Sequence, residues 1–157
     1  EHKTRCAAVE AVCRLLEMGP QQVLEARPTL LKELVGRLSD QQASVRAAAA
    51  TALAHMDAIG GAGALGKFLQ EQKRVAVDPD GEGSNRALTV HATLSGLGRC
   101  SESTVVEWIE AIVLRLQDPS SAVRAAAEDA LRNMGPECAS AMAHRLVQDE
   151  SPVIREL

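Results

Sequence analysis

Aromatic residues are almost absent from this sequence, which has one Trp, one Phe and no Tyr among 157 residues. Compact domains usually obtain much of their buried area from aromatic side chains, so Leu, Val and Ala must form the core here. About one residue in six is Ala. Ala is the strongest helix former and is depleted in strands. The composition therefore favours closely packed helices over a sheet.

An excess of basic residues and a long apolar run are also lacking. The formal net charge is -4, which argues against non-specific binding to nucleic acid through Lys and Arg. The shortage of aromatics removes the stacking platforms of single-strand binders. No run reaches the roughly 18 apolar residues of a membrane span. The first residues lack the layout of a signal peptide and read as the middle of a helix, so we expect a fragment of a longer array.

The four cysteines are scattered and form no CxxC pair. Cys6, Cys13, Cys100 and Cys138 each lie among apolar residues of expected helices, where a free thiol behaves as a small hydrophobe. A disulfide framework is not expected in a chain of this size with so few thiols. We therefore expect an intracellular, reducing compartment, either the cytoplasm or the interior of an organelle.

An internal repeat is the main signal in the sequence. In three segments an Asp is followed six residues later by an Arg, with a β-branched residue just before the Arg. The pairs are Asp40 with Arg46, Asp118 with Arg124, and Asp149 with Arg155. Weaker copies surround Arg5 and Arg86, and the five arginines are separated by 41, 40, 38 and 31 residues. These steps are typical of helix-pair repeats.

The frame Asp-x4-(Val/Ile)-Arg-x-x-Ala-x-x-Ala-Leu resembles the HEAT repeat, especially the short HEAT-like form found in bilin lyases and iron hydroxylases. The resemblance implies an all-α fold in which about four to five helix pairs, with incomplete ends, form a right-handed α-α superhelix. It covers nearly the whole chain, so residues 1–157 are expected to form a single solenoid segment. A HEAT array says little about function, since such arrays serve many tasks.

Apolar periodicity and Gly, Pro and Ser signals predict where the helices lie. The expected helices are 4–18, 21–38, 42–58, 62–74, 84–97, 103–117, 120–134, 136–148 and 151 to the end. Alternate members are the second helices of each pair, and each hairpin needs neighbours on both sides to cover its apolar stripe. Residues 75–85 are rich in Gly and Asp and predict an inserted loop, either solvated or a contact site.

The resemblance also implies a structural role for the repeated acidic and basic residues. In HEAT proteins the turn Asp and the Arg of the following helix commonly form a ladder that bridges one repeat to the next. This role is assigned to Asp40, Arg46, Asp118, Arg124, Asp149 and Arg155. Such pairs help mainly by satisfying helix-start donors and fixing the stacking angle.

Candidate catalytic and metal sites find little support. HEAT-like iron hydroxylases carry His-Glu dyads, but Ala-Ala follows Arg46 and Arg124, and the chain contains no His-Glu dipeptide. No nucleophile elbow or phosphate-binding loop is present, and the acidic stretch 78–82 does not fit an EF-hand. We expect no enzyme activity, no metal and no cofactor.

The favoured function is a protein–protein interaction scaffold or assembly subunit. In HEAT arrays the second helices line the concave side, and their mixed charges suit a specific polar partner. The expected partner-binding residues are Glu10, Arg14, Glu17, His55, Glu128, Arg132 and Asn133. Two alternatives remain open: a bilin or chromophore lyase-like protein, and a nucleic-acid-associated HEAT protein. A small-molecule ligand is not expected.

Overall fold

The computed structural model describes residues 2–18, 20–72, 85–135 and 139–140, and the side chains of 2, 10, 13, 15–18, 20–27 and 85 lie outside this description as well. The described residues are helical and contain no strand. The predicted all-α class is therefore confirmed. The expected loop 75–85, apart from Asn85, lies outside the described residues. So do the expected helices 136–148, apart from 139–140, and 151 onwards.

The observed helices follow the predicted map closely, with one exception. Their bounds are α1 His2–Met18, α2 Pro20–Arg37, α3 Ala43–His55, η1 Asp57–Ile59, α4 Gly61–Glu71, α5 Asn85–Leu97, α6 Glu102–Val105, η3 Val106–Trp108, α7 Ile109–Val113, η4 Leu114–Gln117 and α8 Ser121–Asn133. The exception is the expected helix 103–117, which alternates between α-helical and 3-10 turns. Tighter 3-10 turns shift the direction of successive side chains and are frequent where a helix adapts to its neighbours.

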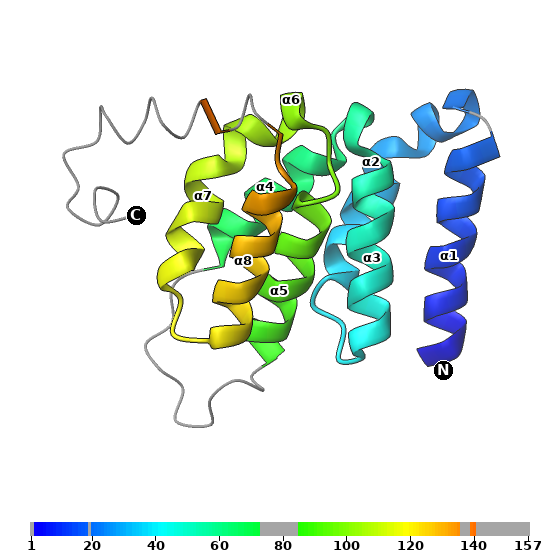
Figure 1. Cartoon of the computed structure of the whole chain (residues 1–157). Helices are drawn as coiled ribbons and strands as arrows, with labels where there is room; N and C mark the ends of the chain where they lie inside the picture. Colours follow the sequence, from blue (N-terminus) through cyan, green and yellow to red (C-terminus); the bar gives the residue numbers. More distant parts are fainter. Residues whose placement is uncertain (1, 19, 73–84, 136–138, 141–157) are drawn as a thin grey trace.

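The helices form two layers, seen in Figure 1. Helices α1, α3, α5 and α8 contact one another in sequence order and make up the second-helix layer. Helices α2, α4, α6 and α7 make up the first-helix layer, in which α4 contacts α2, α6 and α7. The layers meet through α2 against α3, α4 against α5 and α7 against α8. The pair formed by α4 and α5 is therefore covered by the pair before it and the pair after it.

The core between the layers is built from aliphatic side chains and many alanines. Leu53, Leu65 and Leu94 are completely buried, and each contributes about 1.5–3 kcal/mol of hydrophobic stabilisation. Ala126 and Ala127 bury the inward side of α8. Because Ala has a short side chain, neighbouring helices approach closely and one continuous core runs through the layers.

Gly60 and Gly66 occupy positions that suit glycine. Gly60 separates η1 from α4 in a left-handed conformation with φ 108°, which costs glycine little because it has no Cβ. In the middle of α4, a Cβ on Gly66 would collide with the indole ring of Trp108. The only Trp of the chain, which is 9% exposed, therefore packs against α4 at Gly66.

Replacing Gly66 with Ala should destabilise the protein by about 1–3 kcal/mol, because the added methyl group must displace the Trp108 ring from a packed core. Gly63 provides a matched control in the same helix, since a Cβ there meets nothing within 4 Å. Gly63→Ala should instead stabilise by about 0.5–1 kcal/mol through helix propensity. Urea unfolding followed by circular dichroism measures both changes. Equal effects of the two substitutions would contradict the Gly66–Trp108 packing.

Candidate protein-interaction surface

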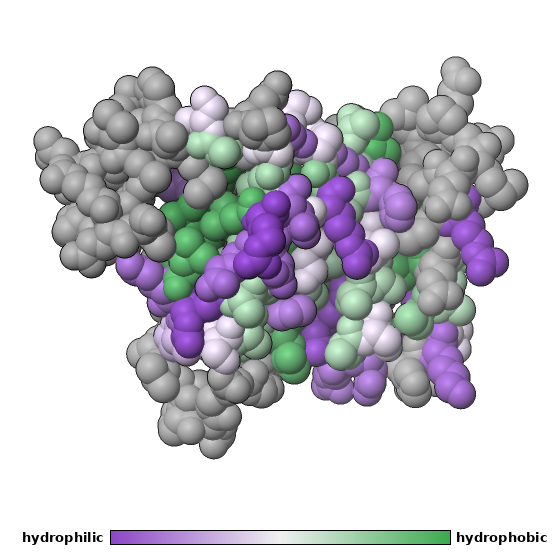
Figure 2. Space-filling view, in the orientation of Figure 1, coloured by the Kyte–Doolittle hydropathy of each residue, from purple (hydrophilic) through white to green (hydrophobic). Residues whose placement is uncertain are grey.

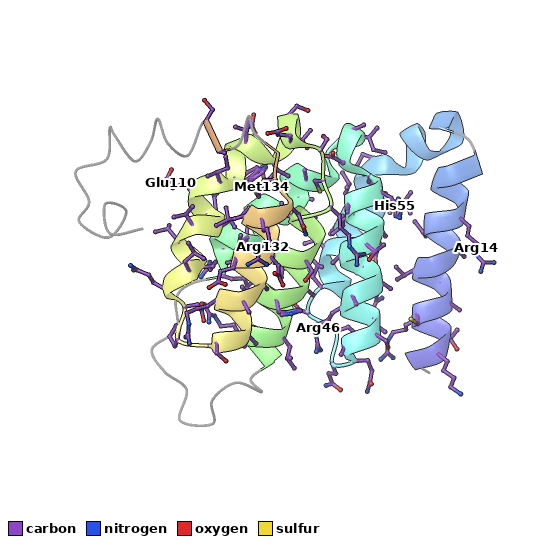
Figure 3. All side chains as sticks on the ribbon, in the orientation of Figure 1. Arg14, Arg46, His55, Glu110, Arg132 and Met134 are labelled. Carbon is purple, nitrogen blue, oxygen red and sulfur yellow. The ribbon has the colours of Figure 1, made fainter. Side chains whose placement is uncertain are left out.

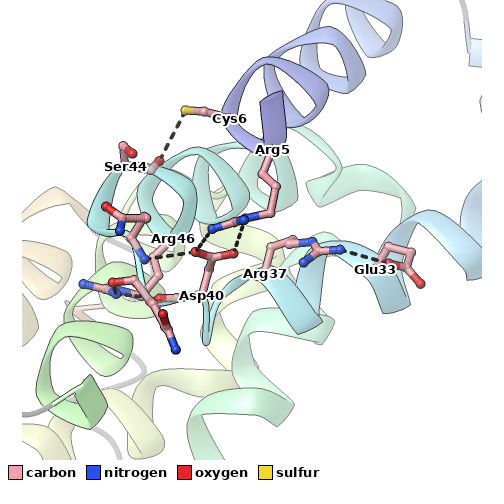
Figure 4. A network of polar contacts seen from close by, with 9 residues as sticks. Arg5, Cys6, Glu33, Arg37, Asp40, Ser44 and Arg46 are labelled. Atoms are coloured by element: carbon pink, nitrogen blue, oxygen red, sulfur yellow. Dashed lines mark hydrogen bonds and ion pairs between the residues drawn. The ribbon is translucent and has the colours of Figure 1, made fainter. Parts of the chain in front are cut away.

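The turn before α3 is held by the carboxylate of Asp40. Its Oδ1 accepts a hydrogen bond of 2.9 Å from the Gln42 main-chain N–H. Arg5 on α1 donates through Nε to Oδ2 at 3.0 Å and through Nη2 to Oδ1 at 3.3 Å, as Figure 4 shows. The Asp40 side chain is 7% exposed. This forked pair joins the second helix of one repeat to the turn of the next.

Arg46 contacts the same turn through main-chain oxygens. Its Nη1 donates to the carbonyl oxygens of Asp40 at 2.6 Å and Gln41 at 3.0 Å, and the residue is 2% exposed. The two members of the repeated frame, Asp40 and Arg46, therefore meet through the backbone of the turn. The Asp40 carboxylate itself pairs with the arginine of the preceding repeat, Arg5.

The turn before α8 repeats this arrangement. The Nη1 of Arg124 donates to the carbonyl oxygens of Asp118 at 2.9 Å and Pro119 at 2.8 Å. Oδ1 of Asp118 accepts from the Ser120 N–H at 3.1 Å. Oδ2 lies 3.8 Å from Nη2 of Arg86 on α5, the arginine of the preceding repeat. The corresponding residues Asp149 and Arg155 lie outside the described residues.

Arg115 adds a contact to this second turn that the sequence did not predict. Its Nη2 donates to the carbonyl oxygens of Leu69 at 2.7 Å and Gln72 at 2.5 Å, at the end of α4. Its Nη1 lies 3.9 Å from Oδ2 of Asp118. A cation suits a helix C-terminus, where carbonyl groups lack intrahelical donors. Arg115 thus connects the end of α4 to the turn before α8.

Asp57 makes a comparable contact at the opposite end of the layers. Its carboxylate accepts hydrogen bonds from the Ser101 N–H at 2.6 Å and from Thr104 Oγ1 at 2.5 Å. It satisfies donors at the start of α6, as a capping side chain would, although it lies 44 residues away from Ser101. A local sequence pattern cannot reveal a cap supplied from another repeat.

Two ionisable groups in these contacts have shifted pKa values. The pKa of Asp40 is lowered, chiefly by the hydrogen bond from the Gln42 main chain and also by Arg5. Burial, and then the charge of Asp57, raise the pKa of the Cys100 thiol to about 12. Cys100 therefore remains a protonated thiol near neutral pH and does not resemble an activated nucleophile.

The residues expected to contact a partner lie on the second-helix face, the exposed surface of α1, α3, α5 and α8. Those with described side chains are exposed, namely Arg14, His55, Glu128, Arg132 and Asn133. Figure 3 labels three of them on three different helices. The side chains of Glu10 and Glu17 lie outside the described residues. Hydrophilic side chains cross the middle of this face in Figure 2.

Helix α5 also contributes to this face, although the sequence interpretation omitted it. Leu88 is 38% exposed, and His91 is exposed, as is Arg99 in the turn that follows α5. The repeat could have located part of this set. Thr51 on α3 lies five residues after the repeat arginine Arg46. His91 on α5 lies five residues after the corresponding Arg86. Because the repeat is only weakly present around Arg86, the equivalence of His91 and Thr51 was not recognised from the sequence.

The described residues offer neither a cluster of metal ligands nor a helix suited to crossing a membrane. Within that part of the chain, no group of three or more His, Cys, Asp and Glu side chains could hold a metal ion. None of the described helices is both long enough and apolar enough to cross a membrane.

Comparison with known protein families gives one result that covers nearly the whole chain. The family described as sister chromatid cohesion protein PDS5 matches residues 1–153. The chain belongs to the PDS5 family. This is a HEAT-repeat-containing cohesion family, so the HEAT-like repeat expected from the Asp–Arg frame is confirmed, while the bilin-lyase type is not shown. No curated protein and no solved structure matches the chain.

In this PDS5-family chain, Asp40→Asn should lower the free energy of unfolding at pH 7 by about 1–2 kcal/mol, because it removes a charge-assisted hydrogen-bonded pair with Arg5. Folding lowers the pKa of Asp40 from its ordinary 3.8. The stabilisation is therefore present above pH 3.8 and is lost as the pH falls through the pKa that Asp40 has in the folded protein. Urea titrations from pH 7 to pH 3 should show the two proteins converging.

Asp129 provides the control for this prediction. It pairs with Arg132 at 2.7 Å, but both side chains are about 70% exposed, at 68% and 70%. Exposed pairs contribute about 0–1 kcal/mol. Asp129→Asn should therefore change stability little at any pH. An Asp40→Asn effect as small as that of Asp129→Asn would contradict the inter-repeat role of Asp40.

Alkylation of Cys100 in the PDS5-family chain should be slow in the folded state. With a pKa of about 12, only about one thiol in 10⁵ is ionised at pH 7. Iodoacetamide labelling, followed by mass spectrometry of the Cys100 peptide, should proceed at least about tenfold faster in urea than in native buffer. Equal rates in the two conditions would show that Asp57 and burial do not protect the thiol.

Proposed function

We propose that this chain is a non-catalytic protein-interaction scaffold of the sister chromatid cohesion machinery. The match to the PDS5 family over residues 1–153 carries the proposal, because members of that family act as cohesin-associated scaffolds. The partner is accordingly a protein of the cohesin assembly. The contact surface is the second-helix face, with Arg14, His55 and Arg132 among its exposed residues.

The arrangement of this face supports a role in protein recognition. Its exposed residues come from successive helices that share one core, so they are held on rigid elements. Its exposed residues carry both signs of charge: Glu128 lies beside Arg132 on α8, while the charged residues described as exposed on α1, such as Arg14, are basic. Mixed charges favour specificity for one partner over a general attraction to polyanions. In the proposal, the layers continue as a right-handed α-α superhelix with this face on the concave side.

The Asp–Arg ladder has a supporting role in this proposal. The pair of Arg5 with Asp40 links α1 to the turn before α3, and that of Arg86 with Asp118 links α5 to the turn before α8. Arg46 and Arg124 bind the main chain of their own turns. These contacts fix the spacing of successive repeats and therefore the spacing of the partner-binding residues.

Family membership also favours one location and one class of partner. The PDS5 family is nuclear and chromosome-associated, so the nucleus is the proposed compartment. A cohesion family supports a protein partner over the bilin-lyase alternative. The net charge of -4 likewise favours protein over direct binding to duplex DNA.

The function is tested by mixing the purified chain with purified cohesin and measuring association by analytical ultracentrifugation. A stoichiometric complex with a Kd in about the micromolar range or tighter is expected of a specific protein–protein interaction. Reversing two charges in Arg14→Glu/Arg132→Glu should weaken the complex by about tenfold or more while the helical circular-dichroism signal is retained.

Parallel samples distinguish the other functions. Absence of a complex at about 100 μM of each component would contradict the proposal. Spectral changes on adding bilin would point instead to a chromophore lyase. Association with duplex DNA that falls steeply with salt concentration would indicate a nucleic-acid-associated protein.

A further inference from the structure

A groove of about 370 Å³ lies between α3 and α5 on the second-helix face. It exists because the facing surfaces carry small side chains. Ala43, Ala47 and Ala50 line it from α3, and Gly96 lines it from α5. A Cβ on Gly96 would approach the Ala50 carbonyl oxygen to 3.0 Å, so the two backbones are in close contact at this end. The floor of the groove is therefore apolar and shallow.

One exposed aliphatic side chain borders this floor. Leu88 is 38% exposed. Among the described residues, Leu114 is the only other large hydrophobic residue that is exposed. An exposed Leu alone is ordinary. Here it lies beside an alanine-lined groove of the right size to receive one or two side chains of a peptide, at the low end of known ligand sites.

The charge of the groove is of one sign. Its described lining includes the exposed Arg99 and His91 and the buried Arg46, whose Nη1 binds the turn before α3, and no Asp or Glu. Arg99 is exposed and crosses from the end of α5 to donate to Thr51 Oγ1 on α3 at 2.6 Å. Within the described part of the chain, no carboxylate lies within ion-pair distance of Arg99. A guanidinium fixed at a groove edge suits a carboxylate from outside the chain.

A second pocket provides a contrast on the first-helix side. It lies between α4 and α7, has a volume of about 350 Å³, and is also lined by one exposed leucine, Leu114. Its lining includes the exposed carboxylates of Glu107 and Glu110. Two pockets of similar size, each with an exposed leucine, therefore differ in their carboxylates: this second pocket has two exposed ones beside the buried Arg115, whereas the groove between α3 and α5 has none.

We propose that the groove between α3 and α5 binds a short acidic segment of a protein partner. An aliphatic side chain of that segment packs on the alanine floor against Leu88, and a flanking carboxylate pairs with Arg99. The inference rests on the proposed scaffold function and names the chemistry that this part of the second-helix face recognises. Charge complementarity selects the acidic segment, and the apolar floor requires an aliphatic residue within it.

The test uses the purified chain labelled with ¹⁵N and a short synthetic peptide in which Leu is flanked by Glu and Asp. Amide shifts are followed by NMR during titration. We expect saturable changes that are confined to α3, α5 and the turn after α5, and that include Leu88, His91 and Arg99. A peptide of the same length with Lys in place of Glu and Asp should bind at least about tenfold more weakly.

Matched variants locate the binding. Leu88→Asp should weaken peptide binding by about tenfold or more, because it removes the apolar contact and adds a repelling charge. Leu114→Asp, at the acidic pocket, should leave it unchanged. Both leucines are exposed, so both variants should retain the fold, which circular dichroism checks. Arg99→Gln removes the proposed pairing with the peptide carboxylate and keeps Leu88, so its effect on peptide binding measures the carboxylate contact separately from the apolar contact.

Three results would overturn the inference: no saturable shifts, shifts spread evenly over the surface, or equal binding of the basic peptide. Displacement of the acidic peptide by duplex DNA at equal charge would assign the groove to phosphate instead.

The proposed function and the groove assignment can fail independently of each other. If cohesin binds the chain and Leu88→Asp leaves that affinity unchanged, the groove assignment falls and the scaffold function stands. If the peptide binds and cohesin does not, the groove assignment stands and the scaffold function falls.

Discussion

Each helix pair in this protein has apolar side chains that only the neighbouring pairs can cover. The alanine-rich inner sides of α3 and α8 bring the helices close together but contribute little area of their own. Larger residues from other repeats complete the core, such as Leu94 on α5 and Trp108 from the first-helix layer. Stability therefore depends on contacts between successive pairs, as expected of repeat proteins.

Polar contacts between repeats add direction to this packing. Arg5 and Asp40 connect α1 to the turn before α3, and Asp57 caps the start of α6 from the preceding pair. Hydrophobic burial is roughly proportional to area and has no preferred direction, whereas a forked guanidinium–carboxylate pair has a defined geometry. These contacts hold the helices at fixed spacing, so exposed residues such as His55 and Arg132 keep their relative positions on the second-helix face.

The sequence was sufficient to predict where most helices lie, but it did not predict which side chains connect one repeat to the next. The apolar stripe and flanking turn signals predicted α3 and α8 closely, because both helices follow an Asp-led turn and carry regular alanines. The 3-10 turns within 103–117 depend on packing against α4 and α8 and leave no local pattern. Likewise, the repeat identified Asp40 and Arg46 as neighbours, but the pairing of Asp40 with Arg5 depends on how successive repeats lie against each other.

Native-state hydrogen exchange measures this dependence on neighbours most directly. If each pair is stabilised by the pairs on both sides, amides of α5, which contacts α3, α4 and α8, should exchange only through global unfolding. Amides of α1, which contacts α2 and α3, should exchange at a lower free energy. Protection of α1 equal to that of α5, or earlier opening of α5, would contradict the account.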